Sequence, residues 1–130
     1  MANAVAVLMV ETELPITMIC ADAAIPKGTI LKLSTPYTVA ASAAAHDLFG
    51  GIAAEEKIAG DGKLQIAVYR GGIFKCEAGT SGVTVGKHVV IEAANEFTDY
   101  TTLDPEKGES WGVALESATN GQLFMLDLGR

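Results

Sequence analysis

Few residues in this sequence have the type and spacing that chemistry requires, and each candidate fails a necessary condition. Gly86 and Lys87 reproduce the Gly-Lys step of a phosphate-binding loop, which also needs a Gly five residues before Gly86 and a Ser or Thr after the Lys. Ser81 and His88 occupy those two positions. We therefore interpret Gly86 and Lys87 as a hairpin turn.

His46 and Asp47 form a dipeptide that some metal-dependent phosphohydrolases use. A metal site needs further ligands that converge on the same point. The other histidine, His88, lies in a predicted strand, and no spaced set of His, Asp and Glu accompanies it. We therefore predict no metal ion and no cofactor, and we expect Asp47 at a turn or a helix end.

Two further pairs carry side chains of the kind that catalysts use. Glu55 and Glu56 are adjacent, so their side chains point to different faces and cannot share a proton as a dyad; a solvated edge is expected. Lys75 would favour the thiolate of Cys76, but no histidine base is near it in the sequence, and we expect this strand cysteine in the core. The G-x-S-x-G motif of hydrolases and the Met-Lys pair of biotinyl hairpins are both absent. The sequence therefore predicts a protein that is not an enzyme.

Composition supports a single folded domain. The chain has 130 residues and a mean hydropathy of +0.30, and 49% of its residues are hydrophobic, which excludes a wholly disordered chain. A chain of this length buries roughly two-thirds of its unfolded surface. The formal net charge is -7, and the nine Lys and Arg residues form no basic cluster. Nucleic acid and anionic membranes are therefore not expected as partners.

No targeting segment is predicted. A signal peptide needs a positive residue before its apolar run, but the first lysine, Lys27, follows the apolar run at residues 4–10. No run is long enough to span a bilayer. Cys20 and Cys76 are isolated, which indicates two reduced thiols in a protein made in the cytoplasm.

Most of the chain predicts short strands separated by glycine turns. Strands are expected at residues 4–10, 14–20, 29–33, 37–39, 64–69, 73–77, 83–85, 88–93, 98–103, 111–115 and 122–128. Residues 52–54 are expected to form a strand or a second turn. One short helix is predicted at the alanine-rich residues 40–48, with Ser42 as its cap and Gly50 and Gly51 after its end. The fold class is therefore all-β with one short helix, as a small barrel or sandwich.

The N-terminal run has two apolar faces, which predicts burial on both sides. One interpretation is that residues 4–10 form the first strand of the core. The other is an arm at residues 1–13 that pairs with a partner chain by strand addition, followed by a β domain at residues 14–130. Ordering an arm of roughly ten residues costs on the order of 10–20 kcal/mol of backbone entropy, so only a deep or multivalent interface would offset it.

Four short motifs occur in a characteristic order. They are a Pro26-Lys27-Gly28 turn before a strand, residues 49–53 (FGGIA), residues 72–74 (GIF) and residues 112–115 (GVAL). In order and spacing they resemble a family of small tailed-phage proteins related to the lambda-type head decoration, or cement, proteins. The resemblance covers residues 15–128, with one extra glycine in the second motif.

This resemblance implies a β-tulip domain with an N-terminal arm, acting as a structural protein of the virion. Such proteins bind the major capsid protein on the outside of the expanded capsid, as homotrimers at three-fold positions, and stabilise the shell against internal DNA pressure. The arm approaches the capsid and joins one of its strands. By position, the corresponding residues are Ala2, Ala4, Val5, Ala6, Val7, Leu8, Met9 and Val10.

Two other functions stay open from the sequence. A β-clip-like module that binds a small molecule would also carry Pro-x-Gly turns, and it would show a ligand pocket without needing a trimer. A small enzyme or carrier domain would need a modified lysine or a converging polar cluster, and the sequence suggests neither.

Overall fold

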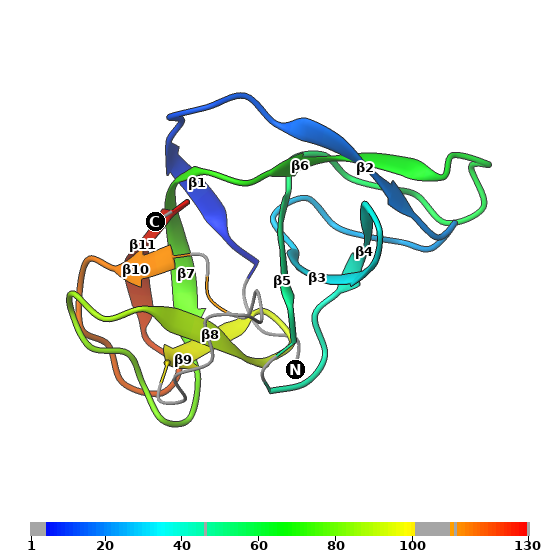
Figure 1. Cartoon of the computed structure of the whole chain (residues 1–130). Coiled ribbons are helices and arrows are strands. Elements are labelled where there is room, and N and C mark those ends of the chain that lie inside the picture. Colours follow the sequence, from blue (N-terminus) through cyan, green and yellow to red (C-terminus); the bar gives the residue numbers. More distant parts are fainter. Residues whose placement is uncertain (1–4, 46, 101–109, 111, 130) are drawn as a thin grey trace.

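The computed structural model describes residues 5–45, 47–100, 110 and 112–129, and the regular elements of these residues are all strands (Figure 1). They are β1 (Val7–Val10), β2 (Ile16–Cys20), β3 (Ile30–Thr35), β4 (Thr38–Ala41), β5 (Phe49–Ala53), β6 (Gln65–Tyr69), β7 (Gly72–Ala78), β8 (Val89–Ala93), β9 (Glu96–Asp99), β10 (Gly112–Ala114) and β11 (Leu123–Leu128). The predicted all-β class is confirmed. Among the described residues, no helix has the length and apolar character that crossing a membrane requires.

Five strands close a small barrel in the order β2-β4-β3-β5-β6. Strand β2 is antiparallel to β6 and parallel to β4. Alternate residues point inward, as the period of two along β6 predicts, and Ile66 and Val68 are buried while Gln65 is exposed. The barrel interior is filled by Met18, Cys20, Ile25, Leu31, Val39, Ala53, Ile66 and Val68.

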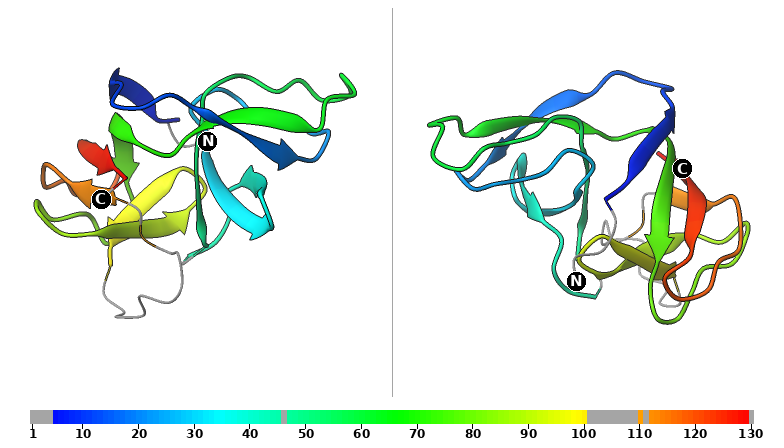
Figure 2. Two further views of the ribbon diagram at one scale, coloured as in Figure 1. Left: turned by 45° about the horizontal axis from the view of Figure 1, so that its top comes forward. Right: turned by 180° about the vertical axis from the view of Figure 1, so that it is seen from behind.

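The remaining strands form a second, mixed sheet in the order β10-β11-β7-β9-β8, and β1 also pairs with β7. Strand β7 follows β6 directly and carries the chain from the barrel into this sheet (Figure 1). It is antiparallel to β11 along Gly72–Glu77, so β1 and β9 share its other edge. A single bridge between His88 and Val113 brings β10 back to the start of β8, and the sheet curls as Figure 2 shows.

Strand β5 lies between two hydrophobic cores, which explains why all five of its residues are buried. Ala53 points into the barrel, whereas Phe49 and Ile52 join the larger core formed with the second sheet. Gly51 has a φ of +131°, and a Cβ at this position would contact the Val68 side chain and lie 2.7 Å from the Tyr69 carbonyl oxygen. The glycine is therefore required by close packing as well as by its backbone conformation.

A polar contact also joins the two parts of the fold. Asn95, in the turn between β8 and β9, has a φ of +59°. Its Oδ1 accepts a 2.8 Å hydrogen bond from the Ile30 N–H, and its own N–H donates to Ser42 Oγ at 3.2 Å. Ser42 and Ile30 are buried, so these bonds satisfy polar groups that water does not reach.

The predicted helix at residues 40–48 is wrong. Strand β4 continues to Ala41 and β5 begins at Phe49, and the described residues between them form a turn. The Asp47 carboxylate accepts hydrogen bonds from the N–H groups of Ala43 at 2.9 Å and Ala44 at 3.0 Å. These local bonds and the pairing of β3 with both strands outweigh the helix propensity of the alanines. Asp47 is thus a turn residue, one of its two expected places, and His46 lies outside the described residues.

Candidate interaction surface

The residues that the sequence analysis considered for catalysis or metal binding do not lie together in the structure. The Lys87 N–H donates to the Thr84 carbonyl oxygen at 3.1 Å, so a turn is present here as predicted. It is not a hairpin turn, because Val83 pairs with Ala118 and β8 pairs with β9. Cys76 is buried as predicted, and burial raises the pKa of its thiol. Glu55 and Glu56 are both exposed. Among the described residues, no three His, Cys, Asp or Glu side chains are placed to hold a metal ion.

Sequence reasoning missed a buried lysine beside the barrel. Lys57 Nζ donates to Asp22 Oδ1 at 2.7 Å, to Asp61 Oδ1 at 2.6 Å and to the Ile58 carbonyl oxygen at 2.9 Å. All three N–H groups of the ammonium are therefore satisfied. Asp22 also accepts hydrogen bonds from the N–H groups of Gly60 and Gly62.

The electrostatics of this cluster indicate a structural role. The hydrogen bond from Lys57 is the main cause that lowers the pKa values of Asp22 and Asp61. Burial acts to lower the pKa of Lys57, but its hydrogen bonds to the two aspartates outweigh burial and the pKa is raised. All three groups stay charged at neutral pH, so none is poised to transfer a proton. The cluster joins two loops that are far apart in sequence.

The predicted arm residues lie against the chain's own second sheet. Val5 is half-buried and Ala6 is buried, and the Ala6 N–H donates to the Gly28 carbonyl oxygen at 2.8 Å. Residues Val7–Val10 form β1, antiparallel to β7. Ala2 and Ala4 lie outside the described residues. Residues 7–10 of the apolar run therefore form a strand, and pairing of this strand with a partner chain stays a prediction.

Strand β1 does not receive the two-sided burial that its composition predicts. The exposed fractions are 54% for Val7, 36% for Leu8, 48% for Met9 and 49% for Val10. Among the described strands, β1 pairs with β7 alone, so its other edge is open. Exposed edges usually carry a charged residue or a proline, and β1 has neither; a bulge between Leu8 and Val10 is its only protection.

The apolar surface continues from β1 across the outer side of the second sheet. Residues directly opposite in antiparallel strands share a face. One row consists of Val10, Ile73, Asp127 and Val113, and a second row consists of Val7, Lys75 and Met125. The alternate residues of β7 and β11, such as Phe74 and Phe124, are buried on the inner side. We call these seven residues of the two rows the outer face.

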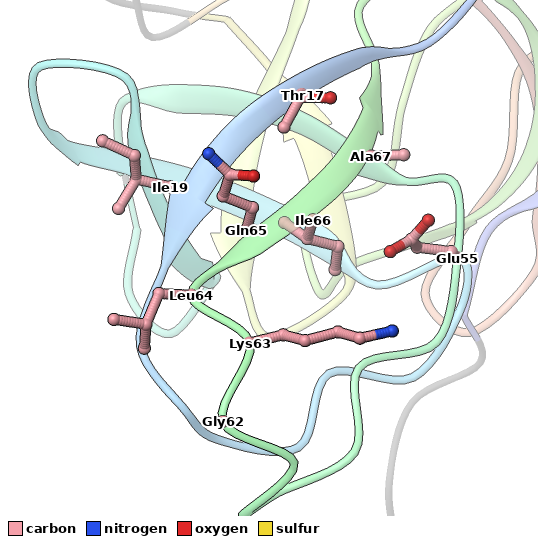
Figure 3. A pocket seen from close by; sticks show the side chains of 9 residues that line it. All are labelled: Thr17, Ile19, Glu55, Gly62, Lys63, Leu64, Gln65, Ile66 and Ala67. Atoms are coloured by element: carbon pink, nitrogen blue, oxygen red, sulfur yellow. The ribbon is translucent and has the colours of Figure 1, made fainter.

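A hollow of about 730 Å³ lies on the other part of the molecule, along β2 and β6. Figure 3 shows the Lys63 side chain extending toward the side of the hollow where Glu55 lies, with Ile19 and Leu64 on the opposite side. Ile66 is the one buried residue of its lining. A hollow with walls of exposed side chains and no buried polar group has little to orient a small molecule.

Comparison with known proteins bears on the fold. No protein-family model matches this sequence, and no curated protein matches it. Among solved structures, the N base of the head fiber gp8.5 in bacteriophage phi29 matches with a TM-score of 0.57 and 20% sequence identity. The match covers 88% of this chain and 92% of that chain. This is a phage head protein other than the lambda-type proteins that the motifs resemble. At this identity the likeness shows a shared fold, so the chain has the fold of the phi29 head fiber base.

Proposed function

We propose that this chain is a structural protein of a phage virion, attached to the outer surface of the capsid. The observation that supports this most directly is the fold match over nearly the whole length of both chains to the base of a phage head fiber. In the finer form of the proposal, the chain binds the major capsid protein of the expanded shell as homotrimers at three-fold positions. There it stabilises the shell against internal DNA pressure.

The surface chemistry is consistent with attachment. A strand with four exposed apolar residues and an open edge can add to a strand of another protein, because its backbone groups supply hydrogen bonds and its side chains fill pockets. The acidic chain has no basic cluster for nucleic acid. Several copies joined in one assembly would multiply the effective affinity of individually weak contacts.

The position of β1 changes the energetics that the sequence alone suggested. A free arm would lose on the order of 10–20 kcal/mol of backbone entropy on docking. Here residues 7–10 are already ordered by pairing with β7, and Ala6 is anchored on Gly28. In our proposal a capsid strand therefore adds to the open edge of β1 and extends a sheet that already exists.

The test is co-sedimentation with expanded and unexpanded shells of the phage that encodes the protein. We expect wild-type protein to bind expanded shells only. Met9→Lys places a charge on the edge strand, where a lysine blocks strand addition, and should abolish binding. Leu64→Lys, an equally exposed apolar position on the barrel side, is the matched control and should bind normally.

The outcomes separate the two parts of the proposal. Wild-type protein that binds neither form of the shell would overturn the capsid role. Met9→Lys protein that binds as well as wild type would leave attachment standing and remove β1 from it.

The second candidate is the small-molecule-binding module, which would have to use the hollow along β2 and β6 as its ligand site. A ligand seated there should raise the melting temperature of wild-type protein and fail to raise that of Leu64→Lys. If no compound in a metabolite collection raises the melting temperature of wild type more than that of Leu64→Lys, the hollow does not bind a small molecule and the second candidate function is excluded.

A further inference from the structure

Charged residues are unequally distributed along β1, and its first residue lies at a positive end. Lys75 is directly opposite Val7 in the pairing with β7. Lys27 precedes Gly28, whose carbonyl oxygen accepts the Ala6 N–H at 2.8 Å. Both lysines are exposed, and among the described residues neither ammonium makes a hydrogen bond or an ion pair. Strands lie about 4.8 Å apart, so a strand added to β1 would run about 10 Å from Lys75, within the combined reach of a lysine and a glutamate side chain.

The other end of β1 is negative. Glu11 follows Val10 directly and is exposed. The Tyr69 hydroxyl donates to Glu11 Oε2 at 2.9 Å, which leaves Oε1 for a second donor. Glu13 is also exposed, but its charge acts on the Arg70 guanidinium, so Glu11 is the carboxylate that a partner would meet first. The edge therefore carries positive charge beside its first residue and negative charge beside its last.

Between the two charged ends the strand is apolar on both of its faces. Val7 and Val10 lie on the outer face, whereas Leu8 is opposite Phe74 on the inner side. Every residue of β1 is exposed. A strand added to this edge would meet apolar side chains on both of its own faces, so apolar residues at successive positions fit it best.

We propose that the open edge of β1 binds a capsid segment with a run of apolar residues as long as β1, an acidic residue at the end beside Val7 and a basic residue at the end beside Glu11. The identity of this partner rests on the proposed function, and the charges add the chemistry by which it is recognised. A strand that is apolar on both faces specifies register poorly, since a slip of one residue exchanges one apolar face for the other. Charges at both ends fix register and direction, because a shifted or reversed segment would place like charges beside one another.

A second copy of the chain is the rival occupant of this edge. Two copies paired antiparallel through β1 would set the lysine end of one beside the Glu11 end of the other. Such a contact is two-fold and would close the edge to a capsid strand. It is therefore an outcome of the experiment that would overturn the proposal.

Co-sedimentation with expanded shells at increasing protein concentration tests the charges. The variant K27E/K75E reverses the positive end and should bind at least about tenfold more weakly than wild type, because it places carboxylates beside the acidic residue of the segment. Glu11→Gln keeps an acceptor for the Tyr69 hydroxyl, removes the negative charge, and should also bind more weakly. The control K63E/K87E makes the same change in net charge as K27E/K75E at two exposed lysines outside β1 and β7, and it should bind as wild type. Circular dichroism establishes that each variant is folded.

Photo-crosslinking identifies the segment itself. p-Benzoylphenylalanine is placed at Val7 in one variant and at Thr12 in another, and the capsid peptides joined by irradiation on expanded shells are sequenced by mass spectrometry. We expect both positions to mark one segment of the major capsid protein, with an acidic residue toward the Val7 crosslink and a basic residue toward the Thr12 crosslink. Two unrelated segments, or one segment with the charges in the opposite order, would overturn the proposal.

Failure of this inference can be told apart from failure of the proposed function. Wild-type protein that binds neither expanded nor unexpanded shells would overturn the capsid role and, with it, the partner named here. Shell binding that K27E/K75E retains in full would overturn the charge recognition and leave the capsid role standing. Wild-type protein that is a dimer by sedimentation equilibrium, with the dimer lost in Met9→Lys, would assign the edge to a second copy and overturn the inference.

Discussion

The N–H of Ala6 donates a 2.8 Å hydrogen bond to the carbonyl oxygen of Gly28, and this bond anchors the N-terminal strand on the turn at residues 26–28. Gly28 has a φ of +88°, and a Cβ there would clash with the Ala6 carbonyl oxygen and stand 3.3 Å from Val5 Cβ. The Pro-x-Gly turn thus needs its glycine for two reasons. One is backbone conformation and the other is the close passage of the arm.

Gly28→Ala should therefore destabilise the protein and loosen residues 5–10. Alanine at a positive φ costs more than about 1 kcal/mol, and the clash with Ala6 adds to that cost. The midpoint of urea unfolding measures the loss. Gly121→Ala is the matched control, because Gly121 has a φ of +81° with no atom within 4 Å of the added methyl group. Equal losses in the two variants would show that the arm does not press on Gly28.

The cluster of Lys57, Asp22 and Asp61 predicts how stability depends on pH. The pKa values of the two aspartates are lowered in the fold. Their contribution to folding stability is therefore fully present at a pH above the ordinary aspartate pKa of about 3.9. This contribution is lost as the pH falls through the lower pKa values that the two aspartates have in the folded protein. The pKa of Lys57 is raised, so its contribution is present below about 10.4 and is lost as the pH rises through the folded value.

Melting temperatures from pH 2 to pH 11 test this dependence. Lys57→Met keeps the length of the buried chain but leaves Asp22 and Asp61 without their ammonium partner. The variant should melt several degrees lower at pH 7, and its difference from wild type should shrink in strong acid. Lys63→Met, at a neighbouring exposed lysine, should melt like wild type. A Lys57→Met profile parallel to that of wild type would contradict the assignment.

Glu96 predicts the opposite pH dependence. Burial, a hydrogen bond with Glu77 and the charges of Glu77 and Glu92 raise the pKa of Glu96. The fold thus disfavours the charged form of Glu96. At a pH below the ordinary glutamate pKa of about 4.3, Glu96 is protonated in the folded and unfolded states and the fold loses no stability. As the pH rises from there through the folded pKa, the loss of stability grows to its full size. Glu96→Gln should therefore stabilise the protein at pH 8 by about 0.5 kcal/mol.

The pH dependence of the gain distinguishes this explanation from a general effect of substitution. At pH 3 the gain from Glu96→Gln should disappear. Glu56→Gln, at an exposed position, should change stability at neither pH. A gain of the same size at pH 3 and pH 8 would mean that repulsion between carboxylates is not its cause.

Local sequence pattern was enough to predict most of the strands and the turn chemistry between them. Alternation along residues 64–69 predicted β6, in which Ile66 and Val68 are buried and Gln65 is exposed. The core position of Cys76 also followed from its place in a predicted strand. These features depend on side-chain periodicity and on φ preferences, which act within a few residues.

Tertiary structure decided the features that depend on distant parts of the chain. The alanines at 43–45 favour a helix locally, but pairing of β3 with β4 and β5 places them in a turn. Lys57 is buried because Asp22 lies beside it, 35 residues earlier in the sequence. The outer face exists only because β1, β7, β11 and β10 pair in one register, since a shift of one residue would send every side chain to the other side. Register between distant strands is set by how the whole core packs, and no local pattern contains it.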